Sequence, residues 1–279
     1  MTTQTAVTDH VITLNGLRFH YRDWPSARAG AQDLVLLHGF TSHARSWDAF
    51  AQAMSRDYRV LALDQRGHGE TEWAAPDRYG VDEMVSDLEA FVAALRLDRF
   101  VLLGLSMGGR NAIHYAGKRP PQLERLVIVD IGPETGAGGA ARIQASLQAN
   151  DSFESVEAAL EQGRRANPNA DEAEQRHRIA HNLMQTAGGT WTYRYDRALR
   201  DPSNPRPRPS ADEGWRLVAS IAVPTLLVRG EVSDVLPREV ADRMLREIPD
   251  SRFAEVAGSG HSIPLERPQG FLVAVRAFL

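Results

Sequence analysis

Five short runs of the chain are apolar at nearly every position, and polar or helix-forming stretches separate them. The runs occupy residues 34–37, 60–63, 100–103, 126–129 and 225–228. A strand needs continuous hydrophobicity when its sheet is covered on both faces, as parallel sheets usually are. Between the second and third runs, residues 81–95 carry apolar side chains at helical spacing. This alternation predicts an α/β fold with a mostly parallel central sheet and helices on both faces.

A hairpin is expected before the first of these runs. Asn15-Gly16 interrupts an alternating apolar pattern between Val11 and Trp24. Both residue types tolerate positive φ, so the dipeptide favours a tight turn between antiparallel strands.

The alternation of strands and helices stops between residues 132 and 212. This stretch is rich in alanine, arginine, glutamate and glutamine, and it ends in a proline series at residues 201–209 that no helix can continue. The pattern predicts one core, formed by residues 1–131 and 213–279, interrupted by an inserted helical cap at residues 132–212. The length of 279 residues agrees with a single α/β unit of this kind.

Charge balance and the absence of cysteine exclude several function classes. The 32 lysines and arginines against 36 aspartates and glutamates give a net charge of −4, which indicates no nucleic acid or anionic membrane as partner. Without cysteine the chain has no thiolate nucleophile, disulfide or cysteine-ligated zinc. No signal-like start and no run of ~20 apolar residues are present, so we expect a cytoplasmic monomer or homodimer that acts on a small molecule.

The segment Gly104-Leu-Ser-Met-Gly108 directly follows an apolar run and directly precedes a helical pattern. In this context a G-x-S-x-G string forms a tight strand-to-helix turn that exposes the serine oxygen at the edge of the sheet. Ser106 is therefore the candidate nucleophile, and the amides at the start of the helix favour the negative charge of an acyl-transfer intermediate. The alternative is a glycine-rich loop with an incidental serine.

With this motif the chain resembles the α/β-hydrolase superfamily over almost its whole length. His38-Gly39-Phe40 is similar to the oxyanion loop of that superfamily, and residues 64–69 resemble its turn after the next strand. The resemblance implies an oxyanion hole formed by the backbone amides of Phe40 and Met107. It also implies His261, which follows the serine in chain order, as the general base, and chemistry that needs no metal and no organic cofactor.

Two aspartates compete for the acidic position. The superfamily usually places its acid in a G-x-x-D-x-x-x-P pattern, but between Gly230 and Pro237 this chain has Ser233 at that position and Asp234 one residue later. Asp130 lies at the end of the run 126–129, and carboxyl ends of parallel strands collect functional groups. We favour Asp130 and keep Asp234 as the alternative acid.

The resemblance implies that Ser106 attacks a carbonyl, forms an acyl-enzyme and so hydrolyses a carboxylic ester or a related amide or enamide bond. Residues 129–134 and 229–234 and the region around His177 are similar to the group of the superfamily that contains 2-(acetamidomethylene)succinate hydrolase. Two alternatives remain, a meta-cleavage-type C–C bond hydrolase and a non-catalytic ligand-binding member of the fold.

The second half of the insertion is strongly basic. Between residues 176 and 208 there are two acids, Asp196 and Asp201, against seven arginines. The arginines are Arg176, Arg178, Arg194, Arg197, Arg200, Arg206 and Arg208. Arginine binds carboxylates bidentately, which indicates an anionic substrate, whereas the alternative is a solvated surface. The candidate substrate-binding residues are Arg45, Trp47, Arg178, Trp191 and Tyr193.

Overall fold

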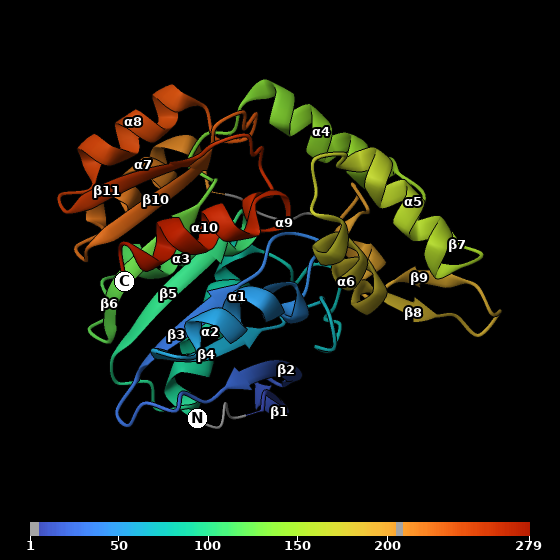
Figure 1. Ribbon diagram of the computed structural model, residues 1–279, viewed down its shortest axis with the longest axis horizontal. Helices are drawn as coiled ribbons and strands as arrows, with labels where there is room; N and C mark the ends of the chain where they lie inside the picture. Colours follow the sequence, from blue (N-terminus) through green and yellow to red (C-terminus); the bar gives the residue numbers. More distant parts are fainter. Residues whose placement is uncertain (1–5, 205–208) are drawn as a thin grey trace.

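The structure of the chain is a computed structural model that describes residues 6–204 and 209–279, so Arg206 and Arg208 lie outside the described residues. Its centre is an eight-stranded sheet with the strand order β1-β2-β4-β3-β5-β6-β10-β11 (Figure 1). The strands are β1 (Thr8–Leu14), β2 (Leu17–Trp24), β3 (Gln32–Leu37), β4 (Tyr58–Leu63), β5 (Phe100–Leu105), β6 (Leu123–Val129), β10 (Thr225–Gly230) and β11 (Ser251–Val256). From β4 to β11 all neighbours are parallel, whereas β1, β2 and β4 pair antiparallel.

Burial on both faces explains the five continuous apolar runs. In β3, Val35 and Leu37 join the core cluster on one face, whereas Leu34 and Leu36 join the cluster on the other. The first cluster lies under α2 (Val81–Ala94), α3 (Met107–Gly117), α7 (Ala211–Ser220) and α8 (Arg238–Glu247). The second lies under α1 (Asp48–Met54) and α10 (Pro268–Arg276). The prediction of a mostly parallel sheet with helices on both faces is confirmed.

The predicted hairpin joins β1 and β2. Asn15 and Gly16 form its turn with φ values of 49° and 81°, and the flanking residues Leu14 and Leu17 pair across the strands. Positive φ at both central positions is what this short turn requires.

The segment between β6 and β10 is mainly helical and also contains a small sheet that the sequence pattern did not indicate. Its helices before α7 are α4 (Ala137–Gln148), α5 (Val156–Ala166), α6 (Glu172–Asn182) and the 3-10 turn η2 (Arg197–Leu199). The strands β7 (Ser152–Phe153), β8 (Leu183–Gln185) and β9 (Trp191–Tyr193) form an antiparallel sheet in the order β7-β9-β8. In Figure 1 these elements, from α4 to β9, extend from one side of the central sheet.

The last helix of this segment belongs to the layer that covers the sheet. Trp215 and Val218 of α7 are buried in the same core cluster as residues of α3 and α8. Among the described residues, no helix is both long and apolar enough to cross a membrane.

Candidate active site

Ser106 lies in a strained turn between β5 and α3. Its φ and ψ of 54° and −112° fall in a region that residues with a side chain rarely adopt. The turn is possible because glycines flank it. A Cβ at Gly104 would lie 2.3 Å from the carbonyl oxygen of Gly108, and one at Gly108 would lie 2.4 Å from the carbonyl oxygen of Leu37. The backbones of β3, β5 and α3 therefore approach one another at the point where the serine is presented.

Three side chains meet at the carboxyl edge of the sheet. His261, in the loop between β11 and the short helix α9 (Ile263–Glu266), has its Nε2 2.9 Å from Ser106 Oγ. Its Nδ1 lies 2.8 Å from Oδ2 of Asp130, which directly follows β6. Asp130 is fully buried and His261 nearly so. With the Nδ1 proton donated to Asp130, Nε2 can accept the proton of the serine hydroxyl.

The carboxylate of Asp130 is held by two further donors. The amide of Gly230 donates to Oδ1 at 2.9 Å, and the hydroxyl of Ser233 donates to Oδ2 at 2.5 Å. The Ser233 oxygen in turn accepts from the amides of Val235 and Leu236. The serine at the superfamily's usual acid position thus supports an aspartate that arrives from the neighbouring strand.

Asp234 does not contact His261. It forms an ion pair with Arg142 at 2.6 Å, and this hydrogen-bonded partner lowers the pKa of the Asp234 carboxyl. The structure therefore brings Asp130, and not the alternative Asp234, to the histidine. Sequence spacing favoured this aspartate but left the question open.

The loop after β3 lies against the serine turn. Gly39 is close enough that a Cβ there would be 3.6 Å from Cβ of Ser106. His38 holds this loop, because its Nδ1 donates to the Gly39 carbonyl and its Nε2 accepts from the amide of Gln65. Burial lowers the pKa of His38 to about 3, so the ring is neutral and can serve as donor and acceptor at once.

A cavity of about 820 Å³ opens over Ser106 and His261. Phe40 and Met107 line it beside the serine, and α4, α5 and α6 close it from the inserted segment. Trp47, Arg178 and Tyr193 also line it, as expected of substrate-binding residues. Trp47 contributes little surface, since it is 1% exposed and packs against Phe50 and Phe271.

Two expected substrate contacts are not brought to this cavity. Arg45 instead pairs with Asp9 and Glu70, since the turn after His43 directs it towards the N-terminal hairpin. Trp191 packs into a separate apolar cluster with Phe153 beneath the small sheet. These placements correct the expectation that both residues contact the substrate.

Glu266 was missed by sequence reasoning. Its carboxylate accepts from the amides of Gly260 and Ser262, the two neighbours of His261, and from the side chain of Asn167. It therefore braces the loop that carries the histidine. No sequence motif indicates this role, because the contact depends on how the loop folds back on α9.

Metal ligands are not gathered at this site. Within residues 6–204 and 209–279, no cluster of three or more histidine, aspartate or glutamate side chains has an arrangement that could hold a metal ion.

Known proteins resemble this chain in sequence and in fold. A family model described as "Alpha/beta hydrolase family" matches residues 34–275. A 3-hydroxybutyrate-oligomer hydrolase of Cupriavidus necator is 30% identical over 272 residues, covering 94% of this chain and 92% of that protein. An alpha/beta hydrolase structure from Novosphingobium aromaticivorans superposes with a TM-score of 0.87 at 26% identity, covering 98% of this chain and 97% of the other. The structure of E-2-(acetamidomethylene)succinate hydrolase, at 21% identity and a TM-score of 0.86 over 98% and 99% of the two chains, has the same fold.

Proposed function

Because the chain belongs to the alpha/beta hydrolase family, we propose that it is a serine hydrolase that cleaves a carboxylic ester or a related acyl bond of a small molecule. The observation that carries the proposal is the chain of hydrogen bonds from Ser106 through His261 to Asp130, which opens onto the cavity. Nucleophile, base and orienting carboxylate are the three roles that acyl transfer through a serine requires.

In the first half of the reaction, Ser106 Oγ attacks the substrate carbonyl carbon while its proton passes to Nε2 of His261. Asp130 stabilises the resulting imidazolium and holds its orientation through Nδ1. The amides of Phe40 and Met107 stabilise the oxyanion of the tetrahedral intermediate. When the intermediate collapses, His261 returns the proton to the leaving oxygen or nitrogen, and the acyl group stays on Ser106.

In the second half, water replaces the leaving group. His261 accepts a proton from the water as it attacks the acyl carbon, and then gives that proton to Ser106 Oγ as the carboxylic acid departs. The original serine proton leaves with the alcohol or amine, and a proton from water replaces it on Ser106, so the cycle regenerates the enzyme and consumes one water per acyl bond.

The inserted segment acts as a cap that selects the substrate. Side chains of α4, α5 and α6 close the cavity on the side opposite the sheet, so what enters depends on them. The likeness to a hydrolase of 3-hydroxybutyrate oligomers supports hydrolysis of a small carboxylic acid derivative.

Replacement of the nucleophile tests the proposal. The Ser106→Ala variant is expected to lose hydrolysis of short p-nitrophenyl esters to the level of the uncatalysed reaction. A control, Ser220→Ala, removes a hydroxyl that donates to the Arg216 carbonyl on α7 and is expected to keep full activity. A fluorophosphonate probe is expected to label Ser106 in the wild type.

Three results would contradict the proposal. Ester hydrolysis that survives in Ser106→Ala would place the chemistry elsewhere. A wild-type protein that neither labels nor hydrolyses esters would favour a ligand-binding member of the fold. Turnover of a meta-cleavage product in the absence of any ester hydrolysis would favour the C–C bond hydrolase.

A further inference from the structure

Several arginines line the cavity, and two of them are already paired within the protein. Arg142 forms its ion pair with Asp234. Arg200 donates to the carbonyl oxygens of Leu147 and Ala149 at the end of α4. Arg142 thus joins α4 to the core, whereas Arg200 supports the internal structure of the inserted segment.

Arg178 on α6 differs from both. Its side chain lines the same cavity as Ser106 and His261, yet no hydrogen bond or ion pair joins its guanidinium to any residue that the structure describes. The surrounding groups that act on its charge are the phenols of Tyr193 and Tyr195. Burial without a compensating carboxylate lowers the pKa of Arg178. An arginine with five N–H donors and no acceptor is costly in such a place unless a ligand supplies one.

The nearest acid along the helix does not neutralise this charge. Glu174 precedes Arg178 by one turn and also lines the cavity, but no ion pair forms between them in the described part of the chain. Burial raises the pKa of the Glu174 carboxyl. The cavity therefore keeps a positive side at Arg178.

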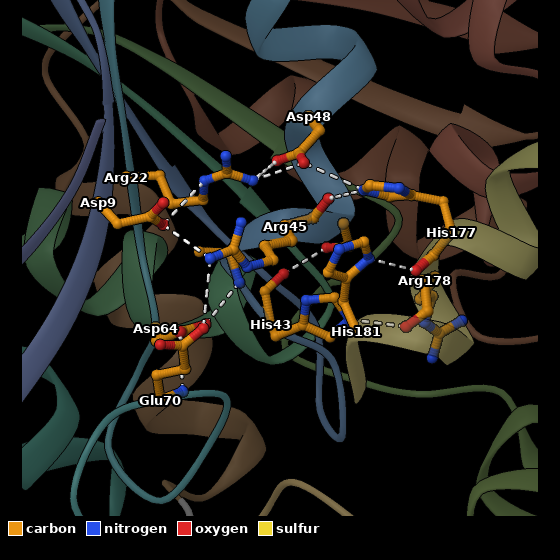
Figure 2. A network of polar contacts seen from close by, with 12 residues as sticks. Asp9, Arg22, His43, Arg45, Asp48, Asp64, Glu70, His177, Arg178 and His181 are labelled. Atoms are coloured by element: carbon orange, nitrogen blue, oxygen red, sulfur yellow. Dashed lines mark hydrogen bonds and ion pairs between the residues drawn. The ribbon is translucent and has the colours of Figure 1, made fainter. Parts of the chain in front are cut away.

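The backbone of Arg178 is fixed to the loop that carries Phe40. His43 donates from Nε2 to the carbonyl oxygen of Arg178 at 2.9 Å, and the side-chain amide of Asn182 donates to the carbonyl of Thr41 at 2.8 Å. His177 Nε2 lies 3.1 Å from a carboxylate oxygen of Asp48. Figure 2 shows the contacts of His43 and His177. In this view the guanidinium of Arg178 points away from the labelled carboxylates of Asp48 and Asp64.

This docking fixes the backbone of α6, from which the Arg178 side chain extends into the cavity. Less of the protein then has to be ordered when a substrate binds, and this increases affinity. A planar guanidinium matches a carboxylate through two parallel N–H···O bonds.

We propose that Arg178 binds a carboxylate of the substrate. The hydrolase then acts on esters or amides that carry a free carboxylate in addition to the bond that is hydrolysed. This inference rests on the proposed function, because the same cavity contains Ser106. Within the basic half of the insertion, Arg178 thus selects the substrate, whereas a neighbouring arginine such as Arg200 stabilises the structure.

A pair of esters of equal length tests the proposal. Monomethyl glutarate carries a carboxylate where methyl pentanoate carries a methyl group, and acid release from both can be followed by titration at constant pH. The wild type is expected to prefer the anionic ester. Arg178→Gln is expected to lower kcat/KM for monomethyl glutarate about 10- to 100-fold, mainly through KM, while methyl pentanoate changes less than about 3-fold. Arg178→Lys is expected to lie between.

A matched control lies two residues away on the same helix. Arg176 is exposed and pairs with Glu157 outside the cavity, so Arg176→Gln is expected to leave both esters unchanged. Thermal unfolding separates substrate binding from structural support. The melting temperature of Arg178→Gln is expected to stay the same or rise, since an unpaired, partly buried charge is removed.

Binding of glutarate to the Ser106→Ala variant separates this inference from the proposed function. Calorimetry is expected to detect glutarate binding to Ser106→Ala and to lose it in Ser106→Ala/Arg178→Gln, whatever the nucleophile proves to be. Equal losses for the two esters, no loss for either, or a lower melting temperature of Arg178→Gln would overturn the assignment. Inorganic phosphate that competes as well as glutarate would overturn its carboxylate selectivity.

Discussion

Each oxygen of the Asp130 carboxylate has its own donors. Oδ1 accepts from the Gly230 amide, whereas Oδ2 accepts from both the Ser233 hydroxyl and His261 Nδ1. A buried carboxylate is stable only when its oxygens are satisfied in this way, and the same bonds fix the direction in which it faces. The position of the histidine ring thus depends on two strands. Asp130 directly follows β6, whereas Gly230 ends β10 and Ser233 lies in the loop after it.

Exchange of the two aspartates for asparagine distinguishes their roles. Asp130→Asn is expected to lower kcat about 10³- to 10⁴-fold, because the amide can hold His261 in the wrong tautomer and cannot stabilise an imidazolium. Asp234→Asn serves as the matched control and is expected to stay within about 3-fold, since its partner is Arg142. Steady-state kinetics with one ester suffices for both. The reverse order of effects would make Asp234 the acid.

Ser233 is expected to act as a positioning residue. Ser233→Ala removes one donor from Oδ2 of Asp130 and is expected to lower kcat about 10-fold with KM unchanged, because the loss concerns the transition state rather than substrate binding. Ser233→Thr keeps the hydroxyl and is expected to restore most of the rate. If Ser233→Ala raises KM alone, or if threonine fails to restore the rate, this role is excluded.

The sequence predicted part of this arrangement. Ser106, His261 and the preference for Asp130 follow from motif and chain order, because tight turns and strand ends depend on local residues. Arg178 stood among seven arginines with nothing local to distinguish it. What distinguishes it is that its guanidinium has no hydrogen-bond or ion-pair partner within residues 6–204 and 209–279, and partners such as Asp234 for Arg142 lie 92 residues away in the chain.

At the scale of elements, the close approach of β5 and α3 fixes the serine turn. Gly104 lies against the backbone of Gly108, so close that a Cβ at position 104 would collide with main-chain atoms. The strain at Ser106 is therefore maintained by packing around it rather than by the serine itself.

Two glycine substitutions test this account. Gly104→Ala is expected to lower the free energy of unfolding by about 3 kcal/mol or to prevent folding, because backbone and not a flexible side chain would have to move. Gly138→Ala is the control, since an added Cβ in α4 meets its nearest atom at 3.6 Å. It is expected to stabilise the protein by about 0.5–1 kcal/mol. Denaturation in urea measures both, and equal effects would contradict the account.

Elements with strong periodicity could be predicted, and short ones could not. Five strands of the central sheet, β3, β4, β5, β6 and β10, were indicated by continuous apolar runs. The strands β7, β8 and β9 have two or three residues each, too few for alternation to be visible. A turn signal was present at Gly188-Gly189, where Gly189 has a φ of 84°, but the arginine-rich surroundings favoured a helical interpretation.

At the scale of the whole molecule, a polar layer lies between the sheet and the inserted segment. Its centre is Asp64, whose carboxylate accepts from His20 and from the amide of Ala44. Burial alone would raise the pKa of Asp64, but the opposing contacts, of which the hydrogen bond from His20 is the largest, together outweigh it and lower this pKa to about 2. His38 and His43 flank this layer in neutral form, one holding the loop with Phe40 and the other holding α6.

These two histidines are expected to make the fold sensitive to acid. Burial lowers the pKa of His38 to about 3 and that of His43 to about 4, against 6.5 for an exposed ring. The groups around the two rings do not reverse this lowering of the pKa. They are Asp64 and His68 at His38, and Asp64, Arg178 and His181 at His43. Below pH 6.5 the unfolded chain therefore binds more protons than the folded chain, and the free energy of unfolding falls as the pH falls.

The free energy of unfolding is thus expected to decrease steadily from pH 6.5 to pH 4, with roughly 3 kcal/mol of the loss due to His43. His20 does not oppose this trend in that window. Although burial favours its neutral form, Asp64 raises its pKa, so the ring is protonated in the folded and unfolded chains alike below pH 6.5.

Urea denaturation at pH 7, 6, 5 and 4 tests this expectation. The free energy of unfolding of His43→Gln should change with pH about half as steeply as that of the wild type. His181→Gln, on the exposed side of α6, should keep the wild-type dependence on pH. A wild-type stability independent of pH over this range would mean that the rings at His38 and His43 are not buried in neutral form, and that α6 is not held to the loop after β3 in the way Figure 2 shows.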